Sequence, residues 1–153
     1  MSLIVQKYGG TSVGSVERIQ AVAERVRRAY SNKDQIIVVV SAMSGETDRL
    51  LGLANKIIQR PRGRELDVLL STGEQVTIAL LCMALETLGI SARSFTGHQV
   101  TITTDTAHNK ARILRIDSER ITNALAAGNV VVVAGFQGQS EQGDITTLGR
   151  GGS

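Results

Sequence analysis

The chain has 153 residues, 42% of them hydrophobic, which suits one compact globular domain. Its formal net charge of +3 does not require a polyanionic partner and only 3% of its residues are aromatic, so we expect no nucleic-acid binding. It has no basic segment leading into an apolar stretch and no run of about 18 apolar residues, so we expect no signal peptide and no membrane span. The single cysteine, Cys82, lies in an apolar run, which predicts a buried thiol and favours a reducing cytoplasm.

The first half of the chain alternates between strand and helix patterns. The apolar run at 3–5 predicts a strand, and apolar residues at helical spacing predict a surface helix over 16–29. The uninterrupted β-branched run at 36–40 predicts a strand that is buried on both faces, as in a parallel sheet. A second helix is predicted over 50–58, and the charged, proline-containing segment 60–64 ends it.

The second half continues this alternation. Residues 76–85 are apolar on nearly every side, which predicts a helix enclosed by other elements, with Gly89 as its C-cap. Three short strands, a helix and a buried strand are then predicted, at 90–95, 100–103, 112–116, 118–127 and 130–134. The whole pattern predicts an α/β domain with a mainly parallel sheet and helices on both faces. Residues 135–153 are glycine-rich, and such a segment after a buried strand normally leads into another element.

Small and polar residues gather in clusters where ligands collect in α/β proteins, at the carboxyl ends of strands. These clusters are residues 7–14, 41–47, 71–74 and 146–153. One glycine-rich turn is as consistent with a plain turn as with a site, but several in one short chain favour a site. In the first cluster Lys7 precedes Gly9 and Gly10, where close backbone approach and a following helix N-terminus suit a phosphate group. The alternative is a lysine that extends from the strand into solvent.

Two of the polar side chains have a structural alternative that the residues alone leave open. Ser71 to Glu74 fits a capping box, and periodicity alone favours this role over the binding of a substrate ammonium group by Glu74. Arg150, flanked by glycines, could bind a carboxylate with both guanidinium nitrogens or face solvent. His98 and His108 do not have the spacing of metal ligands, so we expect no protein-ligated metal site.

The clusters, in their order and spacing, resemble the bacterial aspartate kinases over the whole chain. The resemblance is carried by 7–14 (KYGGTSVG), 40–45 (VSAMSG), 71–74 (STGE), 94–97 (SFTG), 134–138 (AGFQG) and 146–153 (TTLGRGGS). It implies the amino acid kinase fold, a three-layer α/β/α sandwich with a mainly parallel central sheet. It also implies phosphoryl transfer from MgATP to the side-chain carboxylate of L-aspartate, which gives 4-phospho-L-aspartate, the first step towards lysine, threonine, methionine and diaminopimelate.

The resemblance implies a role for each matching residue. Lys7 stabilises the transferring phosphoryl group and is catalytic together with Glu74. The nucleotide is bound by Lys7, Tyr8, Gly9 and Gly10. The aspartate is bound by Ser41, Thr47, Glu74, Arg150, Gly151, Gly152 and Ser153. Mg²⁺ arrives with ATP, and no metal ligand is assigned to the chain. Because a carboxylate nucleophile is already ionised at neutral pH, the reaction needs charge neutralisation and alignment of two anions rather than a general base.

The resemblance also bears on domain organisation. In the family the catalytic domain continues past the segment equivalent to 146–153, into the adenine and ribose site and then regulatory ACT domains. We therefore expect residues 1–153 to be the N-terminal portion of an amino acid kinase catalytic domain, with a fold that is incomplete at its C-terminal end. The complete enzyme is expected to be cytoplasmic and to be a homo-oligomer or to bind a complementary regulatory chain. Two alternatives stay open: a non-catalytic fragment that binds aspartate or assembles with a partner, and a related kinase that acts on another carboxylate.

The isolated 153-residue chain is expected to have little or no kinase activity, because the resemblance places the adenine site outside it. The measurement is ATP- and aspartate-dependent formation of an acyl phosphate, trapped with hydroxylamine. Robust product formation by the isolated chain contradicts this expectation.

Overall fold

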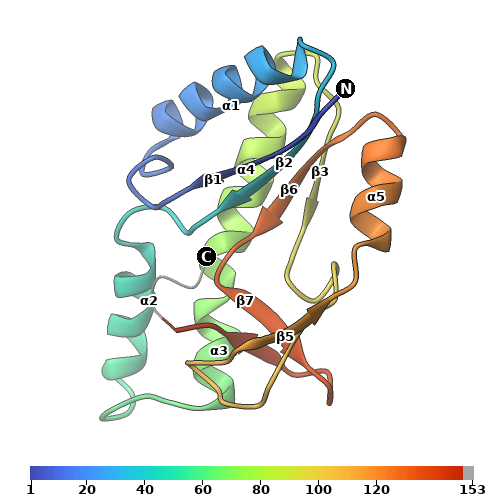
Figure 1. Cartoon of the computed structure of the whole chain (residues 1–153). Helices are drawn as coiled ribbons and strands as arrows, with labels where there is room; N and C mark the ends of the chain where they lie inside the picture. The colour runs from blue at the N-terminus through green and yellow to red at the C-terminus, as the bar shows by residue number, and fades with distance from the viewer. Residues whose placement is uncertain (150–153) are drawn as a thin grey trace.

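The computed structural model describes residues 1–149 (Figure 1). Strands and helices alternate through most of the chain, as the sequence predicts. In chain order the elements are β1 (Leu3–Tyr8), α1 (Val16–Tyr30), β2 (Gln35–Val40), α2 (Glu46–Asn55), α3 (Arg64–Leu70), α4 (Thr72–Thr87), β3 (Ala92–Phe95), β4 (Ile102–Thr104), β5 (Ile113–Ile116), α5 (Glu119–Ala126), β6 (Val130–Ala134), β7 (Gln137–Ser140) and β8 (Ile145–Thr147).

The main sheet has the strand order β1-β2-β6-β3, and every neighbouring pair in it is parallel. The β-branched strands β2 and β6 lie at its centre, and Val38, Val40 and Val132 are fully buried. Parallel strands need crossover connections, and the intervening helices supply them. The predicted parallel α/β architecture is therefore confirmed.

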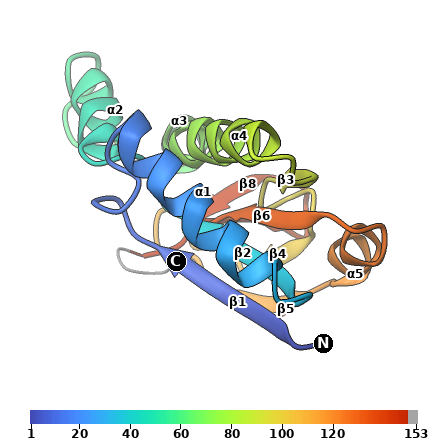
Figure 2. The ribbon, with the colours of Figure 1, turned by 90° about the horizontal axis from the view of Figure 1, so that it is seen from above.

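Helices cover both faces of this sheet (Figure 2). α1 and α4 pack on one face in the larger core cluster, which includes Ile19, Val26 and Leu81. α5 packs on the opposite face through Ala124 and Leu125, against β3 and β6. This arrangement gives three layers, in which the helices on each side cover one face of the central sheet.

Cys82 lies in the α1–α4 layer as a free, buried thiol, as predicted. Burial raises the pKa of this thiol to about 12, because the charged thiolate is disfavoured away from water. The thiol is therefore protonated at neutral pH and behaves as a small apolar side chain.

A second sheet, not predicted from the sequence, has the order β5-β4-β7-β8. Its β7–β8 hairpin is formed by the glycine-rich segment after β6, so that segment does not merely lead into another element. The hairpin was missed because its strands, QGQS and ITT, carry almost no apolar residues. Gly138 allows close packing here, since a Cβ at that position would lie 2.6 Å from Cγ2 of Thr104.

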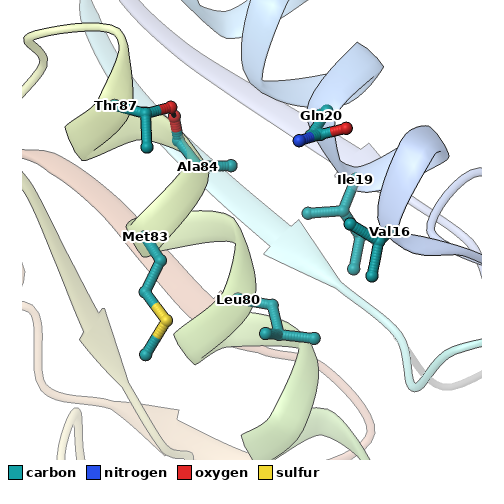
Figure 3. Close-up of a pocket in the computed structure, with 7 residues that line it drawn as sticks. All are labelled: Val16, Ile19, Gln20, Leu80, Met83, Ala84 and Thr87. Carbon is teal, nitrogen blue, oxygen red and sulfur yellow. Dashed lines mark hydrogen bonds between the residues drawn. The ribbon is translucent and has the colours of Figure 1, made fainter.

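Two predicted helix properties are wrong. α2 ends at Asn55 instead of continuing to 58, and Ile57 is 89% exposed, so no apolar contact holds a longer helix together. α4 is not enclosed on all sides, because Met83 is 59% exposed. An apolar groove of about 210 Å³ lies along the contact between α4 and α1, and Leu80 faces Val16 across it (Figure 3).

The helical stretch Arg64–Thr87 is long and apolar enough to cross a membrane by length and composition alone. Half of its most apolar window is buried inside the structure, however, and the core helices of soluble proteins pass the same test. Its apolar character is explained by packing, since α4 contacts α1, β3 and β6.

A buried carboxylate joins α3 to the second sheet. Asp67 is fully buried, and its oxygens lie 2.6 Å from Nδ1 of His108, 2.6 Å from Nδ2 of Asn109 and 2.5 Å from Oγ1 of Thr147. The backbone N–H of Asn109 donates to the same carboxylate at 3.1 Å. Because each oxygen has several partners, the carboxylate is stabilised in place and fastens the loop before β5 and the end of β8 to α3.

Replacing Asp67 by alanine is expected to lower the free energy of unfolding by about 3 kcal/mol or more, because three polar side chains lose their shared partner in a buried site. Urea unfolding measures the change. Glu65→Ala is the matched control on the same helix, since the Glu65 side chain is 79% exposed, and its effect should stay below about 0.5 kcal/mol. Equal losses in the two variants contradict a structural role for the Asp67 contacts.

Candidate functional site

A cleft of about 490 Å³ opens at the carboxyl ends of β1, β2 and β6. It brings together four residues that the sequence analysis placed in three separate clusters: Lys7, Ser41, Thr47 and Glu74. Lys7 is the penultimate residue of β1, and Ser41 follows β2 and donates its N–H to the carbonyl of Tyr8 at 3.1 Å. The parallel pairing of β1 and β2 thus sets these side chains at one edge of the sheet, where α/β proteins bind ligands.

The glycine turn after β1 forms one wall of the cleft by packing against the turn after β2. A Cβ at residue 10 would lie 3.3 Å from the carbonyl oxygen of Ala42, so Gly10 is suited to this approach. Of the predicted nucleotide-binding residues, Lys7 and Gly10 line the cleft, whereas Tyr8 and Gly9 are not among its lining residues. The hydroxyl of Tyr8 donates instead to Oε1 of Gln6 at 2.9 Å. The nucleotide-binding role of the set stays a prediction.

Glu74 does not belong to a capping box. Its neighbour Ser71 has helical backbone angles, makes no capping bond, and donates its hydroxyl to the carbonyl of Val68 at 2.9 Å. α3 ends at Leu70 and α4 begins at Thr72, so Ser71 continues the helical backbone between them and lacks the extended conformation that an N-cap residue usually has. The structural role that periodicity favoured is therefore wrong, and the Glu74 carboxylate is left facing the cleft.

The Glu74 carboxylate is only 2% exposed, and burial raises its pKa from 4.5 to about 7. Hydrogen bonds from backbone N–H groups, including that of Ala42, and from the amide of Gln137 oppose this shift because they favour the ionised form. Glu74 is thus balanced between its neutral and charged forms near neutral pH. A cationic ligand beside it would favour the charged form and release a proton.

The predicted aspartate-binding residues at 150–153 lie outside the described residues, so Arg150 and the Gly151-Gly152-Ser153 segment stay predictions. In the described part of the chain, the charged side chains that line the cleft are Lys7, Asp48 and Glu74. No group of three His, Cys, Asp or Glu side chains within residues 1–149 could hold a metal ion.

Sequence reasoning missed Asp48, which lines the cleft, and gave no role to Phe136 and Gly45, although both lie in the quoted motifs. Phe136 lines the cleft, and Gly45 is the N-cap of α2 with a φ of 79°. Phe136 also has a positive φ, 68°, which no sequence pattern signals for an aromatic residue. Gly73 was quoted within the STGE motif but given no role. A Cβ there would lie 2.9 Å from the Cβ of Ala42, so this glycine lets α4 approach the turn that carries Ser41.

A parallel sheet with a polar cleft at the carboxyl ends of its strands is the arrangement in which α/β proteins bind their ligands. The sequence profile of the amino acid kinase family matches residues 2–153. The chain belongs to the amino acid kinase family.

Relatives and solved structures agree with this assignment. The chain is 65% identical to an aspartokinase of Pseudomonas aeruginosa over 153 residues, which are all of this chain but 37% of that protein. The chain thus spans little more than a third of the curated relatives it matches. The crystal structure of an aspartate kinase from Synechocystis is 49% identical, with a TM-score of 0.80 over 99% of this chain and 24% of that one. The fold is also that of E. coli aspartokinase III solved with aspartate and ADP, with 21% identity and a TM-score of 0.81 over 99% of this chain and 44% of that one.

Glu74→Gln is expected to stabilise the fold increasingly as pH rises. The native state holds the Glu74 proton up to about pH 7, whereas the unfolded chain releases it near 4.5, so this group makes the wild type lose stability as pH rises between these values. The variant has no such loss. Its free energy of unfolding should therefore be close to that of the wild type below pH 4.5 and exceed it by about 3 kcal/mol above pH 7.

Urea unfolding at several pH values measures this difference. Glu86→Gln, at an exposed position of the same helix, is the control and should show no such trend. A pH-independent difference between wild type and Glu74→Gln contradicts the raised pKa.

Proposed function

We propose that this chain is the N-terminal portion of the catalytic domain of an aspartokinase, and that the complete enzyme transfers a phosphoryl group from ATP to the side-chain carboxylate of L-aspartate. The observation that carries the proposal is the 65% identity to the Pseudomonas aeruginosa aspartokinase over every residue of the chain. The cleft supports it, because it gathers a lysine, three hydroxyl side chains and a buried glutamate at one sheet edge. The E. coli enzyme of the same fold was solved with aspartate and ADP, which are a substrate and a product of this reaction.

Lys7 neutralises charge during the transfer. The aspartate carboxylate and the phosphates of ATP are both anionic, so their repulsion is a large part of the barrier. An exposed lysine at the end of β1 reaches the cleft as a mobile point charge, and the glycine turn beside it leaves room for phosphate oxygens. The reaction therefore needs no histidine in the cleft, since the nucleophile is ionised at neutral pH.

The other cleft residues recognise aspartate. Glu74 binds the substrate ammonium group, and the hydroxyls of Ser41 and Thr47 offer hydrogen bonds to its polar groups. Arg150 and the residues that follow it bind the substrate carboxylates. Mg²⁺ enters with ATP and takes its ligands from the phosphates, as Mg²⁺ commonly does in kinases.

The complete enzyme acts in the cytoplasm, in amino-acid biosynthesis, as part of a longer chain with nucleotide-binding and regulatory ACT segments. It forms a homo-oligomer or associates with a regulatory chain. Competition with glutamate and carbamate tests whether the acceptor is aspartate. Calorimetry with aspartate and, separately, with MgATP tests the catalytic assignment, because binding of aspartate without MgATP supports a non-catalytic module instead.

Lys7→Ala in the full-length enzyme is expected to lower kcat by about 100-fold or more, because a group that stabilises transition-state charge is lost. KM for aspartate should change by less than about threefold, since ground-state binding of the amino acid does not depend on this charge. Hydroxylamine trapping of the acyl phosphate measures both constants.

Lys56→Ala, at an exposed position just after α2, is the control and should leave both constants unchanged. A variant of Lys7 that alters only the KM for aspartate refutes the phosphoryl-stabilising role.

A further inference from the structure

Gln137, the first residue of β7, carries a buried amide that does not line the cleft but contacts Glu74, which does. Its side chain contacts three segments that are distant in the sequence. Nε2 donates to the carbonyl of Ser71 at 2.9 Å and to Oε2 of Glu74 at 3.4 Å, and Oε1 accepts the backbone N–H of Gly97 at 3.2 Å. Only 5% of the residue is exposed, so water does not compete for these bonds.

The backbone fixes which way this amide points. The carbonyl of Ser71 can only accept a hydrogen bond and the N–H of Gly97 can only donate one. The Gln137 side chain must therefore direct its NH₂ group towards Ser71 and Glu74 and its oxygen towards Gly97, because the reverse orientation breaks both backbone bonds. A donor is thus presented to the Glu74 carboxylate by a side chain whose rotation is blocked at both ends.

Close packing holds this arrangement together. A Cβ at residue 97 would lie 2.5 Å from the backbone oxygen of Gln137, so the loop after β3 can rest on β7 only because residue 97 is glycine. The amide is therefore clamped between the α3–α4 junction and this loop. Glu74 lies in the first turn of α4 with its carboxylate on the cleft wall, where the backbone N–H groups of Ala42 and of Glu74 itself also donate to it.

The bond from Gln137 also favours the ionised form of Glu74. Burial works in the other direction and is the larger effect, since it raises the pKa of this carboxyl to about 7. Lys7 and Asp48 are the other charged side chains on the cleft walls in the described part of the chain. Losing the amide would leave the carboxylate with its backbone donors alone, so it would be less often charged and less firmly held in one orientation.

We propose that Gln137 is a positioning residue, which holds the Glu74 carboxylate in the orientation that receives the ammonium group of the amino acid substrate and so sets the affinity for that substrate. This inference rests on the proposed function, because it assigns the ammonium group of aspartate to Glu74. Gln137 touches neither substrate itself, and its effect passes entirely through Glu74.

Gln137→Met in the full-length enzyme tests the proposal, because methionine keeps the length of the side chain and removes the amide. KM for aspartate is expected to rise about tenfold, the effect of losing one hydrogen bond to a charged group. KM for ATP and kcat at saturating aspartate should stay within about twofold. The pH at which aspartate affinity titrates should move upwards, since Glu74 ionises less readily.

Two controls separate positioning from a general structural role. Gln139→Met changes the same residue type two positions along β7, where the side chain has no hydrogen-bond partner within residues 1–149, and should leave all constants unchanged. Gln137→Met added to Glu74→Gln should raise the KM for aspartate no further than Glu74→Gln alone. A further rise, or an equal rise in the KM for ATP, overturns the proposal.

Titration of the Glu74 carboxyl by carbon-13 NMR, without substrates, separates this inference from the proposed function. In Gln137→Met the pKa of Glu74 should lie above that of the wild type. If it does while the wild-type enzyme fails to phosphorylate aspartate, the function is wrong but the Gln137–Glu74 contact stands. If aspartate is phosphorylated but neither the pKa nor the KM changes, the positioning role is wrong. Should Gln137→Met fail to fold, Gln137→Leu, which also removes the amide without adding a charge, must shift both quantities in the same direction.

Discussion

The burial of one ionisable side chain, Glu74, is the constraint on which the cleft depends. A carboxylate in this position is costly unless donors surround it, and the donors come from the turn after β2 and from β7. Both must be brought close to the start of α4. Gly73 allows this on one side, because a side chain there would collide with Ala42. The packing of the helix against the sheet edge and the chemistry of the site are therefore set by the same few contacts.

Asp67 and Glu74, the two buried acidic residues within residues 1–149, lie in different environments that suit them to different roles. The oxygens of Asp67 are taken up by His108, Asn109 and Thr147, so no capacity remains for a ligand. Glu74 has fewer protein partners and borders an open cleft. In the sequence both residues are single acids near apolar stretches. Only the tertiary contacts show which carboxylate is fully bonded and which one borders the cleft.

The sequence was informative wherever the signal is local. The β-branched runs of β2 and β6 predicted the parallel sheet, and the small polar clusters at the ends of β1 and β2 supply Lys7, Gly10, Ser41 and Thr47 of the cleft lining. The 71–74 cluster was expected at the end of a strand but lies where α3 meets α4. Sequence-based prediction failed where a structural feature depends on contacts between residues that are distant in the sequence. The β7–β8 hairpin carries no alternating apolar pattern, and Gln137 meets Glu74 across 63 positions of sequence. The capping-box signature at Ser71 misled because α3 already occupies the space before α4.

The buried thiol of Cys82 is expected to react very slowly with thiol-labelling reagents. It is the single cysteine in the sequence, and its pKa of about 12 leaves almost no thiolate at neutral pH, which is the form that reacts with maleimides and iodoacetamides. A cysteine introduced at an exposed cleft residue such as Ser44 would therefore be labelled selectively without first removing the natural one. A fluorophore or spin label at that position can report on ligand entry in an otherwise unaltered core.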